Sequence, residues 1–129
     1  MKKKVILDTN FLLIPGQFMV DIFTELERIM QEPFELCVID KSLKELNQVV
    51  VTGKTKDRFA AKLALALIIQ KNLKTLHSFV TKKSVDDIIV SKADKDTYVA
   101  TQDKALRQRL KEKGAKIIGL RQQKYLEFV

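Results

Sequence analysis

A short, unbroken apolar run stands near the start of the chain and stops at an acid. Val5, Ile6 and Leu7 follow one another without a polar residue, and Asp8 comes directly after them. A continuous apolar run bounded by polar residues is typical of a parallel strand that is buried on both faces. Because open α/β sheets bind ligands just beyond the carboxyl ends of their strands, Asp8 is a candidate functional residue.

Segments with the character of buried strands recur along the chain and alternate with helical patterns. After the first run, strands are expected at residues 34–39, 73–80, 97–101 and 115–120, with 73–80 the weakest. This alternation predicts an α/β fold in which helices cover both faces of a parallel sheet. The tail, residues 121–129, is expected to add a short edge strand.

The helices between these strands are predicted from the spacing of apolar side chains and from capping residues. They are expected at residues 18–30, 40–52, 55–71, 84–93 and 103–113, with Asp40 or Ser42 as the cap of the second. Pro15 and Gly16 are expected to break the chain before the first helix. The helix at 55–71 is apolar on most of its circumference, which predicts substantial burial.

Composition limits the kinds of protein that this sequence can encode. With 129 residues and 46% hydrophobic content, the chain is expected to form one globular domain, residues 1–129. The single cysteine, Cys37, permits no internal disulfide and no cysteine-based zinc site, which favours a reducing, cytoplasmic compartment. The longest apolar helical stretch, residues 63–69, is too short to cross a bilayer, so no membrane partner is expected.

Positive charge is concentrated toward the end of the chain. The formal net charge is +8, and residues 104–124 hold eight Lys or Arg against one acid, Glu112. A basic segment of this density is typical of proteins that bind a phosphate backbone. The alternative is a solvated helix face that maintains solubility. The candidate contacts to such a backbone are Lys104, Arg107, Arg109, Lys111, Arg121 and Lys124.

Four acids stand at the starts or in the early turns of expected helices. They are Asp8, Glu45, Asp86 with Asp87 beside it, and Asp103. Each position also has a purely structural interpretation, because acids and hydroxyls commonly cap the starts of helices. Ser42 and Glu45 have the spacing of a capping box, and Ser84 and Asp87 repeat that spacing.

Asp8 and Asp103 both follow strands that are predicted to be buried. In a doubly wound sheet whose first and fourth strands are neighbours, these residues flank the switch point where a ligand crevice opens. Two carboxylates that face each other repel, and a cation relieves that repulsion. Oxygen ligands without histidine or cysteine favour Mg²⁺ or Mn²⁺. Such a site activates water, and on a basic protein it points to hydrolysis of a nucleic-acid backbone.

The acidic positions taken together resemble the motifs of PIN-domain ribonucleases. The matching segments are Asp8-Thr9-Asn10 after a strand, Glu45 early in a helix, Asp86-Asp87-Ile88-Ile89 with Ala93 beyond, and Val99-Ala100-Thr101-Gln102-Asp103. The resemblance covers essentially the whole chain and rests on the order and spacing of the set. It implies a three-layer α/β/α fold with a central parallel sheet of about five strands in the order 3-2-1-4-5.

The same resemblance implies a metal-dependent endonuclease that cleaves RNA with a metal-activated water. The implied catalytic and metal-binding acids are Asp8, Glu45, Asp86 and Asp103, with Mg²⁺ or Mn²⁺ as the ion. Asn10 and Thr101 are implied to orient the ligands, with Asp87 as a further polar neighbour. Asp86 is preferred over Asp87 because the family's acid stands seven residues before a small residue, here Ala93.

Within that family, the sequence is similar to the ribosomal-RNA-processing branch of archaea and eukaryotes. The basic ending, the doubled Asp86-Asp87 and the run that ends at Asp103 carry this similarity, which implies pre-ribosomal particles as partners. Toxins of bacterial toxin–antitoxin pairs share the acids, so a toxin ribonuclease is an alternative. A non-catalytic RNA-binding or scaffold protein with the same fold is another. The apolar tail around Tyr125 and Phe128 is a candidate surface for pairing with a second copy.

Overall fold

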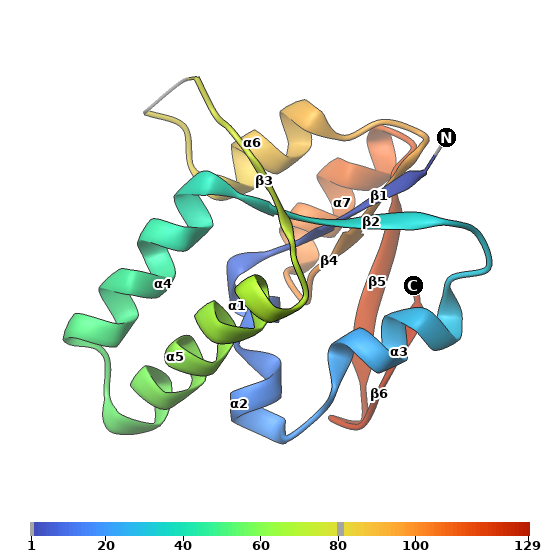
Figure 1. Ribbon diagram of the computed structural model, residues 1–129. Coiled ribbons are helices and arrows are strands. Elements are labelled where there is room, and N and C mark those ends of the chain that lie inside the picture. The colour runs from blue at the N-terminus through green and yellow to red at the C-terminus, as the bar shows by residue number, and fades with distance from the viewer. Residues whose placement is uncertain (1, 80–81) are drawn as a thin grey trace.

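A six-stranded sheet forms the centre of the part of the molecule that the structure, a computed structural model, describes: residues 2–79 and 82–129 (Figure 1). The strands are β1 (Lys3–Leu7), β2 (Phe34–Ile39), β3 (Lys74–Leu76), β4 (Thr97–Ala100), β5 (Lys116–Arg121) and β6 (Tyr125–Phe128). Their order across the sheet is β3-β2-β1-β4-β5-β6, and only β6 is antiparallel to its neighbour among these strands. This confirms the predicted order 3-2-1-4-5 and adds one strand at the edge.

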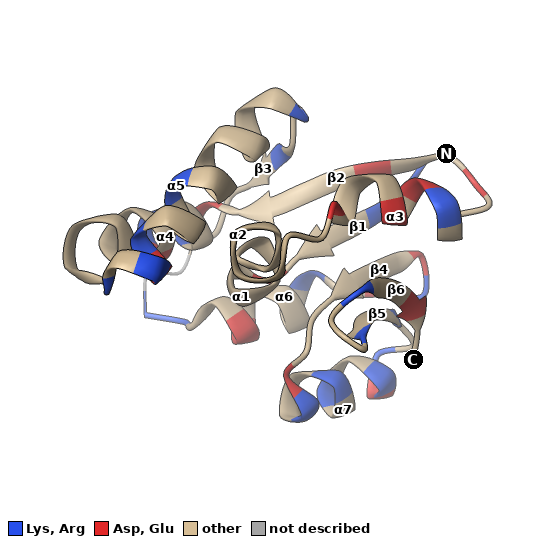
Figure 2. Ribbon diagram, turned by 90° about the horizontal axis from the view of Figure 1, so that it is seen from below, with Lys and Arg blue, Asp and Glu red and all other residues tan. Residues whose placement is uncertain are grey.

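Helices cover both faces of this sheet. They are α1 (Thr9–Leu12), α2 (Ile14–Phe18), α3 (Ile22–Ile29), α4 (Asp40–Thr52), α5 (Thr55–Gln70), α6 (Val85–Lys92) and α7 (Lys104–Glu112). In Figure 2, α6 and α7 lie on one side of the sheet, and α2, α3, α4 and α5 lie on the other. The three-layer α/β/α arrangement is therefore confirmed. None of the helices in the described ranges is long and apolar enough to cross a membrane.

β1 is the buried centre of the sheet. Val5, Ile6 and Leu7 are completely buried and alternate between two hydrophobic cores, with Val5 and Leu7 in one and Ile6 in the other. β1 pairs in parallel with β2 on one side and with β4 on the other. A further backbone hydrogen bond of 3.1 Å, from Asp8 N–H to Ala100 O, continues this pairing past the end of β1. It holds Asp8 level with the end of β4.

The predicted helix at residues 18–30 is wrong at its start. Pro15 lies in the first turn of α2, where its missing N–H is tolerated, so residues 14–18 form a helix where a break was expected. Met19 ends α2 in the left-handed conformation, with φ of 58°. Asp21 then caps α3, because its Oδ1 accepts two backbone N–H groups of the first turn at 3.1 Å.

The start of α4 also differs from the prediction. The helix begins at Asp40, and Ile39 precedes it without a side-chain cap. Ser42 lies inside the helix and is completely buried. The spacing of Ser42 and Glu45 is therefore not a capping box, and both side chains contact Thr9 instead.

The prediction that α5 is substantially buried is wrong. The buried residues of this helix are Ala60, Ala61, Ala64 and Ile68. Phe59 and Ile69, by contrast, are 57% and 81% exposed. The small residues allow α2 to approach closely, since a Cβ on Gly16 would lie 2.5 Å from Ala60 Cα. Leu65 and Leu67 are half-buried against the same core, so the helix packs through this stripe and the leucines beside it, while Phe59 and Ile69 face outward.

The two edges of the sheet are short strands. β3 covers three residues of the predicted 73–80, and Val80 lies outside the described residues. β6 agrees with the expected edge strand in the tail. Its outer edge is covered by α3, because Leu126 N–H donates to Glu25 Oε1 at 2.9 Å and Arg28 Nη2 donates to Leu126 O at 2.7 Å.

Candidate active site

A cavity of about 470 Å³ opens where β1 and β4 end. The four predicted acids that line it are Asp8, Glu45, Asp86 and Asp103. They come from the β1–α1 junction, the second turn of α4, the start of α6 and the residue before α7. The acidic positions at the starts of α6 and α7 are visible as red segments in Figure 2. The switch point of the sheet is therefore acidic, although the protein has a net charge of +8.

Asp8 is the most deeply buried of these acids, with 6% of its surface exposed. Its Oδ1 accepts from Thr9 N–H at 2.8 Å, and its Oδ2 accepts from Thr101 Oγ1 at 2.9 Å. The first bond caps α1, and the second joins the end of β1 to the loop after β4. Because each oxygen has its own donor, the orientation of the carboxylate is fixed.

The surroundings of Asp8 disfavour its negative charge. Burial is the main cause that raises the pKa of Asp8 from an ordinary 3.8 to about 6, and the charges of Asp86 and Asp103 act in the same direction. The hydrogen bonds from Thr101 and Thr9 oppose this effect. A bound cation would stabilise a carboxylate whose charge is disfavoured in this way.

Thr101 links Asp8 to Asp103. It is completely buried, and while its hydroxyl donates to Asp8, its Oγ1 accepts from Asp103 N–H at 3.1 Å. Asp103 also caps α7, because its Oδ1 accepts from Leu106 N–H at 3.0 Å. The capping interpretation of Asp103 and its place in the cavity are therefore compatible. Asn10, the other predicted polar neighbour, is exposed and also lines the cavity.

Arg107 and Gln102 hold the loop that follows β4. Arg107 Nε donates to Thr101 O at 2.9 Å, and Arg107 Nη2 donates to Gln102 Oε1 at 2.8 Å. The Gln102 amide also bonds to the backbone N–H and C=O of Leu120 in β5. Gly119 leaves room for this arrangement, since a Cβ there would lie 2.5 Å from Arg107 Nη2.

Glu45 is held by Thr9, a residue for which the sequence predicted no role. Thr9 Oγ1 lies 2.7 Å from Glu45 Oε1, to which it donates, and 2.7 Å from the buried Ser42 Oγ. The only signal for Thr9 in the sequence is its place between Asp8 and Asn10 in the first acidic motif. Because Ser42 has the spacing of a helix cap, the local sequence pattern did not indicate its contact with Thr9.

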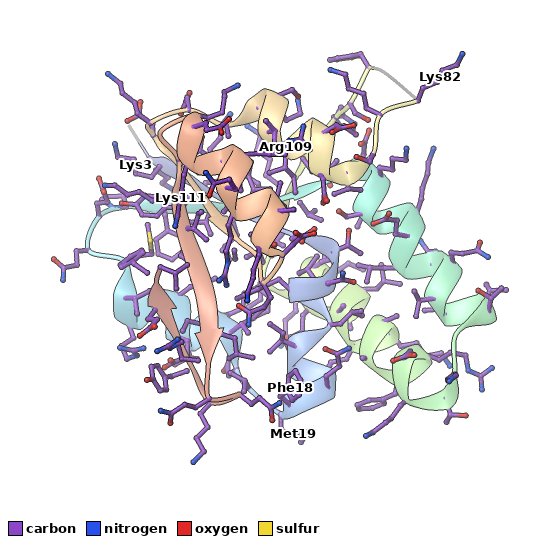
Figure 3. All side chains as sticks on the ribbon, turned by 180° about the vertical axis from the view of Figure 1, so that it is seen from behind. Lys3, Phe18, Met19, Lys82, Arg109 and Lys111 are labelled. Carbon is purple, nitrogen blue, oxygen red and sulfur yellow. The ribbon has the colours of Figure 1, made fainter. Side chains whose placement is uncertain are left out.

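The start of α6 separates two neighbouring acids. Asp86 lines the cavity, where burial and then the charge of Asp103 raise its pKa. Asp87 Oδ1 lies 2.9 Å from Arg109 Nη1 of α7, and this partner lowers the pKa of Asp87. Figure 3 shows Arg109 between the two helices. Ser84 caps α6, with its Oγ accepting from Asp87 N–H at 3.1 Å. The structure thus places Asp86 in the cavity and Asp87 outside it.

The donors that line the cavity suit a hard divalent cation. The four acids offer carboxylate oxygens, and neither histidine nor cysteine is among the described residues that line it. Across residues 2–79 and 82–129, however, no three acidic, histidine or cysteine side chains lie close enough together to hold one ion. Glu45 and Asp103 direct an oxygen to Thr9 and to the first turn of α7. Repulsion between carboxylates favours such separate partners.

The six predicted RNA contacts fall into two groups. Arg107 is bonded to the loop after β4, Arg109 to α6, and Arg121 to Glu127 of β6. The remaining three, which are exposed lysines, are Lys104, Lys111 and Lys124. The guanidinium groups therefore have partners within the protein, and the lysines face solvent.

This chain is similar to known proteins in both sequence and fold. A family model described as a PIN-like domain matches residues 5–123. Ribonuclease VapC4 of Methanocaldococcus jannaschii is 32% identical over 128 residues, which cover 96% of this chain and 95% of that protein. The solved structure of the PIN domain endonuclease Utp24 has a TM-score of 0.79 and 26% identity, and the match covers 97% of this chain and 90% of that one.

A domain of a functionally unknown protein from Methanocaldococcus jannaschii shares the fold, with a TM-score of 0.62 and 18% identity over 92% of this chain and 91% of that one. The family match at residues 5–123 contains all four acids of the cavity and extends into the turn after β5. Because this match spans most of the sequence and the identity to Ribonuclease VapC4 extends over nearly its full length, the chain belongs to the PIN-like domain family.

Proposed function

We propose that this protein is a metal-dependent endoribonuclease that hydrolyses RNA phosphodiester bonds with a metal-activated water. The observation that carries the proposal is the acidic cavity at the ends of β1 and β4, in which Asp8 is oriented by two hydrogen bonds while its charge is disfavoured. The relatives named Ribonuclease VapC4 and PIN domain endonuclease Utp24 support the same activity. We further propose that residues 1–129 form a single nuclease domain and that it acts in the cytoplasm.

Asp8, Glu45, Asp86 and Asp103 would bind Mg²⁺ or Mn²⁺ once their side chains draw closer together, because no three of the described acids lie close enough to share one ion as they stand. When bound, such an ion would supply a water of lowered pKa and would stabilise the charge that develops on the phosphate. Asp8 suits a ligand at the centre of the site because hydrogen bonds from Thr9 and Thr101 fix the orientation of its carboxylate. Asn10 lines the same cavity and would help to orient the ligands.

Glu45 is the candidate acceptor for the proton that the attacking water loses. Its Oε1 accepts from Thr9, whereas its Oε2 has no hydrogen bond to any residue that the structure describes. The Thr9 contact fixes the carboxylate against α1 and leaves the second oxygen available. Glu45 is also exposed, so a proton accepted there is readily passed to solvent.

Cations flank the acidic cavity on two sides and would bring the RNA backbone to it. Lys104 follows Asp103 directly, and Lys82 and Lys83 stand just before Ser84, which lines the cavity. All three lysines are exposed. Positive charge beside an acidic site attracts the phosphates while the metal ion neutralises the acids. We therefore expect RNA binding to weaken steeply as salt is raised.

The direct test is cleavage of one structured and one unstructured RNA by the purified protein. We expect cutting with Mn²⁺, no cutting with EDTA, and no cutting by the Asp8→Asn variant with Mn²⁺. Asp87→Asn is the matched control, since Asp87 pairs with Arg109 outside the cavity. Equal cutting by Asp8→Asn would remove Asp8 from the site, and binding without cutting by the wild type would favour a non-catalytic RNA-binding protein.

We infer that the RNA belongs to ribosome biogenesis, which makes pre-ribosomal particles the expected partners. The basic segment at residues 104–124 and the doubled Asp86-Asp87, which carry the similarity to the ribosomal-RNA-processing branch, support this interpretation. A toxin ribonuclease is the second candidate, and the identity to Ribonuclease VapC4 supports it equally. The two candidates differ in what expression does to a cell.

Expression in cells separates these two candidates. A toxin predicts growth arrest that Asp103→Asn relieves and that a small co-encoded partner also relieves. A processing nuclease predicts normal growth and co-purification with ribosomal RNA precursors. Growth arrest without precursor RNA in the purified sample would contradict the processing role.

A further inference from the structure

A second cavity, of about 330 Å³, adjoins the acidic one and has a different chemistry. Asn10 lines both cavities, so they are neighbours on either side of that residue. Five of the eight residues around the second cavity carry side-chain amides, and no charged residue is among those that the structure describes there. The amides are Asn10, Gln17, Gln102, Gln122 and Gln123, and Phe18 adds an aromatic ring.

The topology of the sheet explains why the two cavities are neighbours. β1, β4 and β5 are parallel and adjacent, so their carboxyl ends lie along one edge of the sheet. Asp8 follows β1, Asp103 follows β4, and the turn at Gln122 and Gln123 follows β5. An RNA strand that crosses this edge at the acids therefore meets the amides next.

The turn between β5 and β6 has an unusual composition for its geometry. Gln122 and Gln123 both have positive φ, 53° and 54°, and Lys124 N–H donates to Arg121 O at 3.0 Å across them. Turns of this type, in which both central residues have positive φ, favour Asn-Gly, because longer side chains adopt the left-handed region at a cost. The fold alone gives no reason for two glutamines at this place.

Backbone of the same unfavourable kind lies on the other side of the cavity. Met19 has φ of 58° and is 85% exposed, directly after Phe18 at the end of α2. Figure 3 shows Phe18 and Met19 together at that end of the helix. Of the four non-glycine residues with positive φ in the described ranges, three therefore lie at or beside this cavity. Unfavourable backbone gathered at one surface indicates a function there.

The amides of this cavity divide into fixed and available groups. Gln102 is committed, because its amide bonds to Leu120 and accepts from Arg107. The side chains of Gln17, Gln122 and Gln123 are exposed and make no hydrogen bond to any other residue in the described ranges. Gln102 therefore forms a rigid wall, and the other three glutamines are free to bind a ligand.

We propose that this amide cavity, lined by Gln17, Phe18, Gln122 and Gln123, holds an unpaired nucleobase next to the scissile phosphate and selects it. An amide offers a donor and an acceptor side by side, which matches the edge of a base. Phe18, with 38% of its surface exposed, supplies a face on which the base stacks. The absence of charged residues among its described lining suits a base better than a phosphate.

The inference rests on the proposed ribonuclease function, and cleavage mapping tests both together. The substrate is an unstructured RNA of mixed sequence, cut in the presence of Mn²⁺, with the cleavage sites read at single-nucleotide resolution. We expect the wild type to favour one base beside the cut by about tenfold over the least favoured base. Loss of the glutamine amides is expected to reduce this preference to about threefold or less.

The informative variant is Gln122→Asn combined with Gln123→Gly. It shortens one amide, removes the other and supplies the residues that the turn geometry favours, so the variant is expected to fold at least as stably as the wild type. Thermal unfolding checks this directly. Phe18→Leu is the second variant, and we expect it to raise KM with little change in kcat. Gln108→Ala, at an exposed glutamine of α7 outside the cavity, is the matched control and should cut like the wild type.

The outcomes separate the proposed ribonuclease function from the proposed selection of a base by the amide cavity. If the wild type cuts no RNA, the proposed function fails and this inference fails with it. If the wild type cuts but shows no base preference, or if the double variant keeps the wild-type preference, only the inference about the amide cavity is overturned. A flattened preference in the double variant, with Gln108→Ala unchanged, supports it.

Discussion

Thr101 donates a 2.9 Å hydrogen bond to Asp8, and the two residues stand 93 positions apart in the chain. The bond exists because β1 and β4 are neighbours in the sheet and end at the same level. The same hydroxyl oxygen accepts from Asp103 N–H, so one buried threonine sets the positions of two acids. A side chain with both a donor and an acceptor is needed at this place.

Thr101→Val keeps the shape of the side chain and removes both hydrogen bonds. We expect the free energy of unfolding to fall by about 1–3 kcal/mol, because two polar groups lose a partner in a buried setting. We expect kcat/KM for RNA cleavage to fall by about tenfold or more, since Asp8 is no longer fixed in orientation. Urea unfolding and steady-state cleavage measure the two effects. Thr101→Ser should restore most of both, and wild-type activity in Thr101→Val would contradict the positioning role.

Asp8→Asn should stabilise the metal-free protein at neutral pH. The pKa of Asp8 is raised from 3.8 to about 6 in the folded state, so folding favours the protonated form. The stability that the proton contributes is fully present below about pH 4 and is lost as the pH rises through about 6. Asparagine never ionises, so the variant avoids this loss. At about 1.4 kcal/mol for each unit of pKa, the expected gain at pH 7.5 is about 3 kcal/mol.

Urea unfolding in EDTA at several pH values between 4 and 7.5 measures this gain. The difference between Asp8→Asn and the wild type should vanish near pH 4 and grow up to about pH 6. Glu112→Gln removes an exposed acid of α7 and serves as the control, with a small effect at every pH. A variant that is less stable than the wild type at pH 7.5 would show that Asp8 is not destabilised as an anion.

Metal affinity should depend on pH in the same range. A divalent ion requires the ionised form of Asp8, so below pH 6 each unit of pH should raise the affinity for Mn²⁺ by about tenfold. Above that range the affinity should level off, because the pKa of Asp8 is about 6. Calorimetric titration of Mn²⁺ at pH 5, 6, 7 and 8 tests this. An affinity that is constant from pH 5 to 7 would exclude Asp8 as a ligand.

Asp86 and Asp87 form a matched pair for mutagenesis. Asp86 lines the cavity, whereas Asp87 pairs with Arg109. We expect Asp86→Asn to lower kcat by about a hundredfold or more, because it removes a charge that would hold the proposed ion. Asp87→Asn should lose an exposed ion pair, with little effect on stability or on kcat. The reverse pattern would move the acidic role to Asp87.

The sequence was informative where a single local signal decides the structure. The run at Val5, Ile6 and Leu7 is apolar on both faces, and only a central parallel strand buries it completely. The alternation of strands and helices predicted a parallel sheet with helices on both faces. The strand order came from the resemblance to PIN-domain ribonucleases, and that order brings the ends of β1 and β4 together. For this reason the shared cavity of Asp8 and Asp103 could be predicted without a structure.

Features that depend on distant partners were not predictable. Ser42 has the spacing of a helix cap, but its buried contact is Thr9, which is 33 positions away. The apolar surface of α5 predicted that most of the helix is buried. Instead, the helix faces α2 with small residues, where Gly16 lies close to Ala60, and Phe59 is exposed. Local patterns cannot show such choices, because they depend on which element lies opposite.

The covering of β6 by α3 affects how this protein meets other chains. Because Glu25 and Arg28 already bond the backbone N–H and C=O of Leu126, α3 disfavours the addition of another strand at that edge. The opposite edge, β3, is only three residues long. Both edges therefore disfavour the addition of a strand from another chain, a form of association that depends little on sequence and can continue into fibres. We therefore expect a partner chain, including a second copy of this protein, to bind through side-chain contacts. Single substitutions at such contacts can change which partner is bound.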